Sequence, residues 1–213
     1  MTKKYLFPTI LALLFITGCS TNYTTRVNNS AGRATIYEDP NTVGKVAGVG
    51  IESQDVVSIT DQMMRDILAT PAIANRTVPP RVIIDDRYFH NESSSVINKR
   101  LITERLMISL NRASVGRIVF VDRSSLEMVQ QERTLKRQGA VSEGTLGAVS
   151  KVAGADFRLI GRIMSQDTTD SNSGNLSRFH MITFKLIDLE TTIPVWTNMY
   201  EFKKSAQDDI IYR

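Results

Sequence analysis

The last third of the chain carries the pattern that most restricts its fold. Apolar or aromatic side chains recur at alternate positions in two segments, 177–189 and 194–202, separated by a short turn. The residues that share one side are His180, Ile182, Phe184 and Leu186 in the first segment and Trp196, Tyr200 and Phe202 in the second. Because side chains alternate between the two faces of a strand, each segment predicts a strand with one buried face. With a further strand expected over 156–166 and a polar turn after it, the chain is predicted to end in an antiparallel three-strand meander.

The middle of the chain alternates helix patterns with short apolar runs. Residues 81–85 and 118–121 are continuous apolar runs, typical of strands buried on both faces. Helical spacing predicts helices over 58–70 and 96–111. A third helix is expected after a capping box of Ser124 with Glu127, and a short one near 146–153; the third would turn Leu126, Val129 and Leu135 inward. This order predicts an α/β (α+β) fold: a single domain with a mixed β-sheet covered by helices, ending in the meander.

The first eighteen residues predict an export signal. Lys3 and Lys4 precede a mostly apolar run over 6–16, which is shorter than the ~20 residues needed to span a membrane. The sequence Ile-Thr-Gly-Cys that follows resembles the bacterial lipobox, and Cys19 is the single cysteine of the chain. We therefore expect Cys19 to be lipidated, with several acyl chains forming a stable anchor. Ser20 in place of Asp favours outer-membrane over inner-membrane sorting, by resemblance to enterobacterial lipoproteins.

These features divide the chain into three parts. Residues 1–18 are expected to be a lipoprotein signal peptide, 19–45 a lipidated flexible tether of small polar residues, and 46–213 a globular periplasmic domain. The signal peptide holds two of the 26 Lys and Arg residues and none of the 22 Asp and Glu residues. The rest of the chain is thus nearly balanced in charge, which argues against a nucleic-acid partner.

Motifs of catalysis are absent from the sequence. It contains no G-x-S-x-G, H-E-x-x-H or Ser-x-x-Lys motif and no Gly-rich loop ending in Gly-Lys-Ser/Thr. One Cys and two His leave little for a metal site, and an acylated Cys19 is no catalytic thiol. We therefore expect no enzyme activity, cofactor or small-molecule substrate. A cell-wall hydrolase using Asp85, Asp86 and His90 stays open as an alternative.

A protein partner is the remaining expectation. Residues 88–95 are predicted to form a polar connection after the first buried strand. Aromatic and arginine side chains are enriched at interface hot spots. The candidate partner-binding residues are Tyr88, Phe89, His90 and Asn91 of this connection, with Arg100 and Arg105 of the helix that follows it. The alternative is that these aromatic side chains pack on that helix.

Several segments together resemble the LpoB family over about residues 45–202. They are Arg81–Asp85, Asn91–Ser94, Ile118–Asp122, Val129–Glu132, Gly154–Leu159 and Val195-Trp196. Some are shared with CsgG-type and TolB amino-terminal domains. The resemblance implies an outer-membrane lipoprotein that faces the periplasm and activates a class A penicillin-binding protein (glycosyltransferase/transpeptidase) in peptidoglycan synthesis.

Two questions stay open at the level of sequence. Residues 20–45 are short and contain one Pro, whereas the best-known LpoB tether is long and Pro-rich. A short tether leaves three possibilities. The partner approaches the outer membrane, part of residues 20–60 unfolds to lengthen the reach, or the partner is a different protein. The alternative function is a CsgG-like secretion or assembly component of the outer membrane, which would need extra membrane-spanning hairpins.

Overall fold

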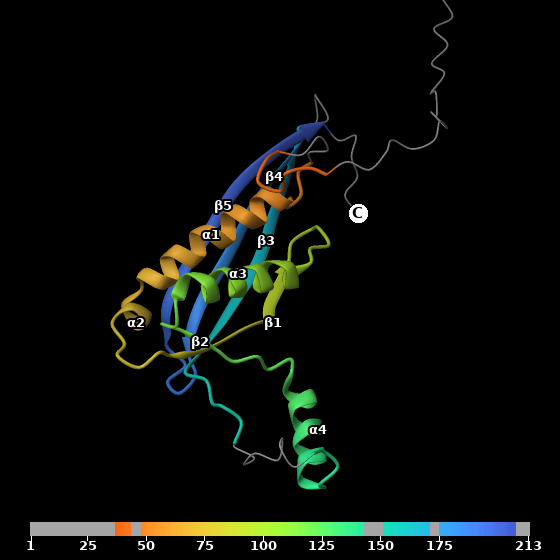
Figure 1. Cartoon of the computed structure of the whole chain (residues 1–213). Coiled ribbons are helices and arrows are strands. Elements are labelled where there is room, and N and C mark those ends of the chain that lie inside the picture. The colour runs from red at the N-terminus through yellow and green to blue at the C-terminus, as the bar shows by residue number, and fades with distance from the viewer. Residues whose placement is uncertain (1–36, 44–47, 143–150, 171–174, 208–213) are drawn as a thin grey trace, which may run out of the picture. The chain divides into compact units, whose positions relative to one another are not determined.

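The computed structural model of the chain describes residues 37–43, 48–142, 151–170 and 175–207 (Figure 1). Apart from Tyr37, all of these belong to one compact unit, Glu38–Arg213. The elements of this unit, in chain order, are α1 (Ser53–Ala69), α2 (Pro71–Ala74), β1 (Arg81–Glu92), α3 (Lys99–Ser114), β2 (Val119–Phe120), α4 (Leu126–Arg137), β3 (Phe157–Thr169), β4 (Asn175–Asp188) and β5 (Pro194–Gln207).

The five strands form one mixed sheet in the order β2-β1-β3-β4-β5. Strand β1 runs parallel to both β2 and β3, whereas the pairs β3–β4 and β4–β5 are antiparallel. The parallel strands are joined through helices and the antiparallel strands through hairpins, as these pairings require. The mixed α/β fold with a terminal three-strand meander is therefore confirmed.

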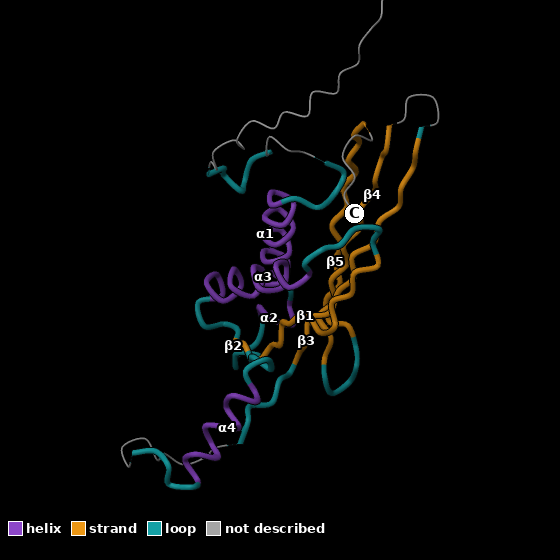
Figure 2. The backbone as a smooth tube through the Cα atoms, turned by 90° about the vertical axis from the view of Figure 1, so that its right-hand side faces the viewer, coloured by secondary structure: helices purple, strands orange, loops and turns teal. Residues whose placement is uncertain are grey.

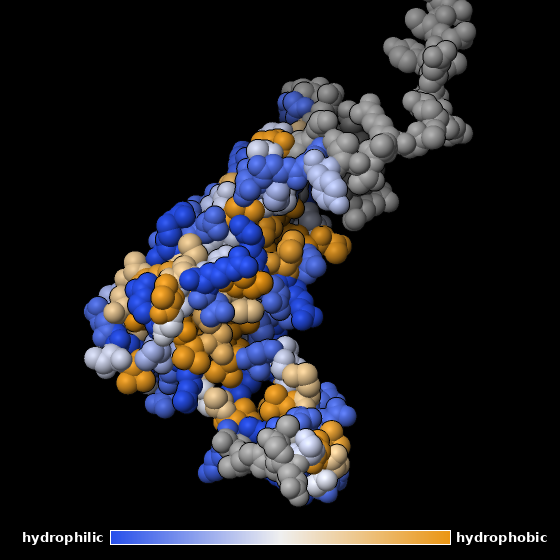
Figure 3. Space-filling model, in the orientation of Figure 1, coloured by the Kyte–Doolittle hydropathy of each residue, from blue (hydrophilic) through white to orange (hydrophobic). Residues whose placement is uncertain are grey.

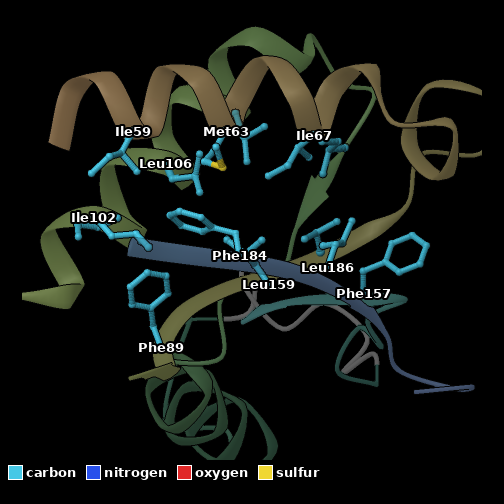
Figure 4. Packing of buried hydrophobic residues seen from close by; sticks show 14 of the residues in the cluster. Ile59, Met63, Ile67, Phe89, Ile102, Leu106, Phe157, Leu159, Phe184 and Leu186 are labelled. Carbon is cyan, nitrogen blue, oxygen red and sulfur yellow. The ribbon is translucent and has the colours of Figure 1, made fainter. Parts of the chain in front are cut away.

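The helices α1 and α3 cover one face of this sheet. Figure 2 shows both on the same side of the strands, with no described helix on the other side. Figure 4 shows Ile59, Met63 and Ile67 of α1 pointing toward Phe184 and Leu186 of β4. These side chains are at most 2% exposed and belong to one buried cluster. We call this side of the sheet the covered face and the opposite side the open face.

Helix α1 is fixed at its amino end by a reciprocal cap. The Glu52 side chain accepts from the backbone of Asp55, and Asp55 accepts from the Glu52 backbone N–H at 2.8 Å. Such a pair satisfies two of the N–H groups that a helix start leaves without partners. The predicted start at residue 58 is therefore late by five residues, because the first turn is polar and lacks the apolar spacing used to find it.

His180 lies fully buried on the covered face and ties β4 to the segment before α1. Its Nε2 atom is 2.6 Å from the Val49 carbonyl oxygen, so this nitrogen donates, and its ring stacks on Phe202. Its Nδ1 atom is buried without a partner among the described residues. Burial is the main cause that lowers the pKa of His180 below its ordinary value. The predicted role of a core histidine agrees with this placement.

A buried arginine joins β3 to β4 near the end of β3 and the start of β4. Arg178 donates to both carboxylate oxygens of Asp167, at 2.6 and 2.7 Å, and to the Ser95 hydroxyl at 2.6 Å. This bidentate pair lowers the pKa of Asp167. Because Ser95 follows β1, the arginine joins the connection after β1 to the hairpin.

The structure corrects the prediction for residues 88–92. They are not a loop: β1 runs without a break from Arg81 to Glu92. Its pairing with β3 shifts between Ile84 and Phe89 and resumes at Phe89 opposite Gly161. The polar residues 85–87 that suggested the end of the strand lie in this irregular stretch, where the apolar pattern is interrupted while the strand continues.

The structure also corrects the prediction for α4. The hydroxyls of Ser124 and Ser125 both donate to Asp122, and the N-cap residue Ser125 makes no side-chain cap bond, so the predicted capping box is absent. These bonds lower the pKa of Asp122. No residue of α4 is buried. The prediction that its apolar side chains point into the core is therefore wrong. Hydrophobic side chains reach the surface over α4 (Figure 3).

Two smaller differences from the prediction remain, at α3 and β2, and one predicted helix is not tested. Helix α3 begins at Lys99 rather than 96, and β2 contains two residues, of which Val119 is 46% exposed. An edge strand of this length has one exposed side, so the expected burial on both faces does not hold there. Most of the short helix expected near 146–153 lies outside the described residues.

Candidate functional site

The structure divides the predicted partner-binding residues between two sides of the sheet. Tyr88 and His90 lie on the open face, and Tyr88 is 46% exposed. Phe89, between them, points to the covered face, is fully buried and contacts the Phe184 ring at a centroid distance of 5.4 Å. Consecutive strand residues point to opposite faces, so Phe89 is part of the core and contributes nothing to a contact surface.

Asn91 shapes the turn after β1. Its amide donates to the Ser95 carbonyl at 2.8 Å, and its carbonyl accepts from the Ser93 backbone and hydroxyl. These local hydrogen bonds fix the turn. They explain why an Asn occupies this position without any need for a contact with a protein partner.

The two candidate arginines are on α3, away from the open face. Arg105 donates to the Thr60 hydroxyl at 3.0 Å and lies 3.7 Å from Asp61, so it joins α3 to α1. Arg100 pairs with Glu104 along the helix and lines a small hollow of about 200 Å³ beside β1 and β2. Neither arginine adjoins Tyr88 or His90. Cys19 lies outside the described residues.

The open face is made by every second residue of the long strands. Burial along β3 alternates, with Phe157, Leu159 and Ile163 buried and the residues between them partly or largely exposed. In β4, the buried residues likewise alternate with others that point away from the helices. The side chains that follow this rule on the open face include Tyr88, His90, Ile160, Arg162, Met164, Met181, Thr183, Lys185, Met199 and Lys203.

Cross-strand register brings these residues into rows. His90 is opposite Arg162, Arg162 opposite Thr183, and Thr183 opposite Met199, so one row crosses four strands. In the next row, Met164 is opposite Met181. An uncovered antiparallel face is usually polar. Here three methionines interrupt it, and methionine side chains adapt readily to a partner's shape.

A hollow of about 380 Å³ lies in the open face. Its walls come from β1, β3 and β4, and its lining is Tyr88, His90, Ile160, Gly161, Arg162, Met164, Thr183 and Lys185. Gly161 of β3 leaves no room for a side chain at this point of the sheet. A Cβ there would lie 2.6 Å from the Thr183 carbonyl oxygen and closer still to the Phe89 ring on the covered face.

Two of the cations on this face are already paired. Arg158 lies 3.2 Å from Asp85, and its guanidinium stands 4.7 Å from the centre of the Tyr88 ring. Arg162 lies 3.1 Å from Glu92. Lys185 is exposed and forms no ion pair with any residue that the structure describes.

Among the described residues, no group of three or more His, Cys, Asp or Glu side chains could hold a metal ion. No helix within the described ranges has the length and apolarity to cross a membrane. The open face offers a surface of mixed polar and apolar side chains with a hollow of about 380 Å³.

Sequence reasoning proposed Tyr88 and His90 as contact residues but did not identify the other residues of the open face. The signal was present in the alternation itself. Once His180, Ile182, Phe184 and Leu186 were placed on the buried side, the intervening Met181, Thr183 and Lys185 had to share the other side. The sequence did not indicate that this side of the sheet is left uncovered by any described helix.

Comparison with known proteins gives the following matches. The family model described as peptidoglycan-synthase activator LpoB matches residues 55–202, more than half of the chain. A search of the curated proteins found no match. Among solved structures, the chain is similar to the LpoB C-terminal domain from Salmonella enterica, with 17% identity and a TM-score of 0.42 over 70% of this chain and 98% of that chain.

Two further solved structures show similarity. One is the LpoB C-terminal domain from Escherichia coli, with 19% identity and a TM-score of 0.40 over 70% of this chain and 98% of that chain. The other is lipoprotein GNA1162 from Neisseria meningitidis, with 15% identity and a TM-score of 0.33 over 62% of this chain and 88% of that chain.

Proposed function

The chain belongs to the LpoB family of peptidoglycan-synthase activators, and from this premise we propose that it is a lipid-anchored periplasmic regulator that binds and activates a class A penicillin-binding protein. The family match carries the proposal. It spans the chain from α1 to within β5, and so contains both faces of the sheet. Family membership supports a role in peptidoglycan synthesis as an activator of a penicillin-binding protein.

The proposed mechanism is differential binding without catalysis by the chain itself. A regulator raises the activity of an enzyme only if it binds the active conformation more tightly than the resting one. The described residues supply a docking surface for such binding and need supply no reacting group. The open face is our candidate surface, because it is uncovered by any described helix and carries exposed Tyr88 and Met199.

The proposed location is the outer membrane, with the domain facing the periplasm and Cys19 as the lipidated residue. In cells that express the full chain, labelled palmitate should enter the wild-type protein and be lost from Cys19→Ala. The Ser20→Asp variant is the matched control: it should keep the label and move from the outer to the inner membrane. Equal labelling of wild type and Cys19→Ala would contradict the anchor.

Activation is tested by adding the chain from Ser20 onward, which contains the whole compact unit Glu38–Arg213, to a purified class A penicillin-binding protein. The rates of glycan polymerisation and of peptide cross-linking should both rise. A synthase that neither binds the chain nor changes rate would contradict the proposal.

A matched pair of variants tests the docking surface. Met199→Glu places a charge on the open face, where the side chain is 51% exposed, and should abolish stimulation. Met128→Glu makes the same change on α4, where the side chain is 64% exposed, and should leave stimulation intact. The reverse result would move the docking surface from the open face to α4.

A further inference from the structure

We propose that the hollow in the open face receives a carboxylate side chain, Asp or Glu, from the protein partner, with Lys185 as its counter-ion. This inference rests on the proposed function, because the partner is the synthase. It adds the chemistry by which the surface recognises that partner. The argument uses the charges that line the hollow, the pairing of each cation, and the apolar side chains beside Lys185.

The lining of the hollow is charged with one sign. The charged residues of the lining are Arg162 and Lys185, and none of the eight lining residues is Asp or Glu. The two arginines Arg158 and Arg162 of the open face each have a carboxylate within the chain: Arg158 pairs with Asp85, and Arg162 pairs with Glu92. A surface that balances its arginines internally and leaves a lysine unbalanced in its hollow is complementary to an added negative charge.

Lys185 is placed so that a bound carboxylate would lose much of its water. Its cross-strand neighbour on β3 is Ile160, and Met164 also lines the hollow. A partner that covers these apolar side chains excludes solvent from the ion pair. The attraction between the two charges then strengthens, because the effective dielectric constant falls. Before docking, the ammonium stays hydrated, which explains why an unpaired cation is tolerated there.

The test measures binding of the chain from Ser20 onward to the immobilised class A penicillin-binding protein that it activates. The variants are Lys185→Glu, Lys185→Met and Lys203→Glu. Lys203 is the matched control, because it is an exposed lysine of the open face on β5 that does not line the hollow. We expect Lys185→Glu to weaken binding by about tenfold or more and Lys203→Glu by less than about twofold. Thermal unfolding of each variant checks that the fold is kept.

Salt separates a charge effect from a change of shape. Binding of the wild type should weaken as salt is raised, because exposed charges are screened. Lys185→Met keeps an apolar chain of similar reach, and its binding should be weaker and less dependent on salt. A substitution of the partner's Asp or Glu by Lys should restore binding to Lys185→Glu and weaken binding to the wild type.

The outcomes distinguish this inference from the proposed function. If the wild type binds the synthase and Lys185→Glu binds as well as Lys203→Glu, the inference is wrong and the proposed function stands. If the wild type binds no class A synthase, both are wrong. If soluble peptidoglycan stem peptides bind at the hollow and are lost in Lys185→Glu while synthase binding is unchanged, the carboxylate comes from the cell wall and the inference is again wrong.

Discussion

The two faces of one sheet differ in how their side chains are used. On the covered face, Phe184 and Ile182 of β4 are fully buried against α1 and α3. On the open face, the neighbouring Thr183 and Lys185 of the same strand line a hollow with unbalanced positive charge. Adjacent residues therefore differ in burial: those on the covered face form the core, and those on the open face stay accessible to the partner that we propose. The predictions below test this separation.

The largest expected effect is on the covered face. Phe184→Ala removes a fully buried ring that contacts Phe89 and should lower the free energy of unfolding by about 3–5 kcal/mol. The measurement is urea unfolding of the chain from Ser20 onward. Lys185→Ala, one residue away on the other face, is the control and should change stability little. Equal losses from both would contradict the separation of the faces.

Gly161→Ala tests how tightly the sheet is packed beside the hollow. The added methyl group would press on the Phe89 ring and on the Thr183 carbonyl oxygen, which belongs to the backbone and cannot turn away. We expect a loss of about 1–3 kcal/mol in the free energy of unfolding, typical of overpacking. Thr197→Ala, at an exposed position of β5, serves as a control. No loss in Gly161→Ala would show that Phe89 has room to move.

The covered face was predictable from sequence because burial leaves a regular pattern. The alternation from His180 to Leu186 predicted β4 and its buried side correctly. At β1 the prediction used a continuous apolar run over 81–85 and ended the strand too early, because the strand continues through a register shift at polar residues 85–87. The polar residues interrupt the apolar pattern on which the prediction relied. Backbone pairing with β3 nevertheless extends the strand to Glu92.

The open face and α4 were less predictable, because an amphipathic pattern does not show which other element, if any, packs against the apolar side. Val129 and Leu135 follow a helical spacing that fits packing inside the chain, yet both are 37% exposed. Likewise, Tyr88 and His90 were proposed as contacts on a loop, whereas they lie on a strand beside the hollow. Arg100 and Arg105 were chosen as near neighbours in sequence, but α3 carries them to the helical side.

A pH titration tests whether His180 belongs to the covered face. Burial lowers its pKa, and the nearby Arg178 and Lys204 cations lower it further, against the Val49 carbonyl and Asp55, which raise it. The unfolded chain therefore binds a proton that the folded chain rejects, and stability rises with pH in that window. As pH falls below about 6.5, the ordinary value, the free energy of unfolding should decrease, by less than the loss from Gly161→Ala.

His180→Gln is the control for this titration, because its amide nitrogen takes the place of Nε2, which bonds the Val49 carbonyl, but does not titrate. Its stability should change less between neutral and mildly acidic pH than that of the wild type. The lowered pKa of Asp167 acts in a separate window: its contribution is present above about 3.8 and is lost as pH falls further. A wild type and a His180→Gln variant with the same slope near pH 6 would show that His180 is not the titrating group.

The smallest expected effect on stability is at Met199 on the open face. Its side chain is 51% exposed and opposite Thr183, so replacing it with Ala leaves no cavity. Met199→Ala should change the free energy of unfolding by less than about 0.5 kcal/mol in the same urea experiment. Its affinity for the synthase should nevertheless fall, because a flexible apolar side chain beside the hollow is lost. A variant that loses stability and keeps its affinity would mean that Met199 serves the fold, and that the open face is part of the core after all.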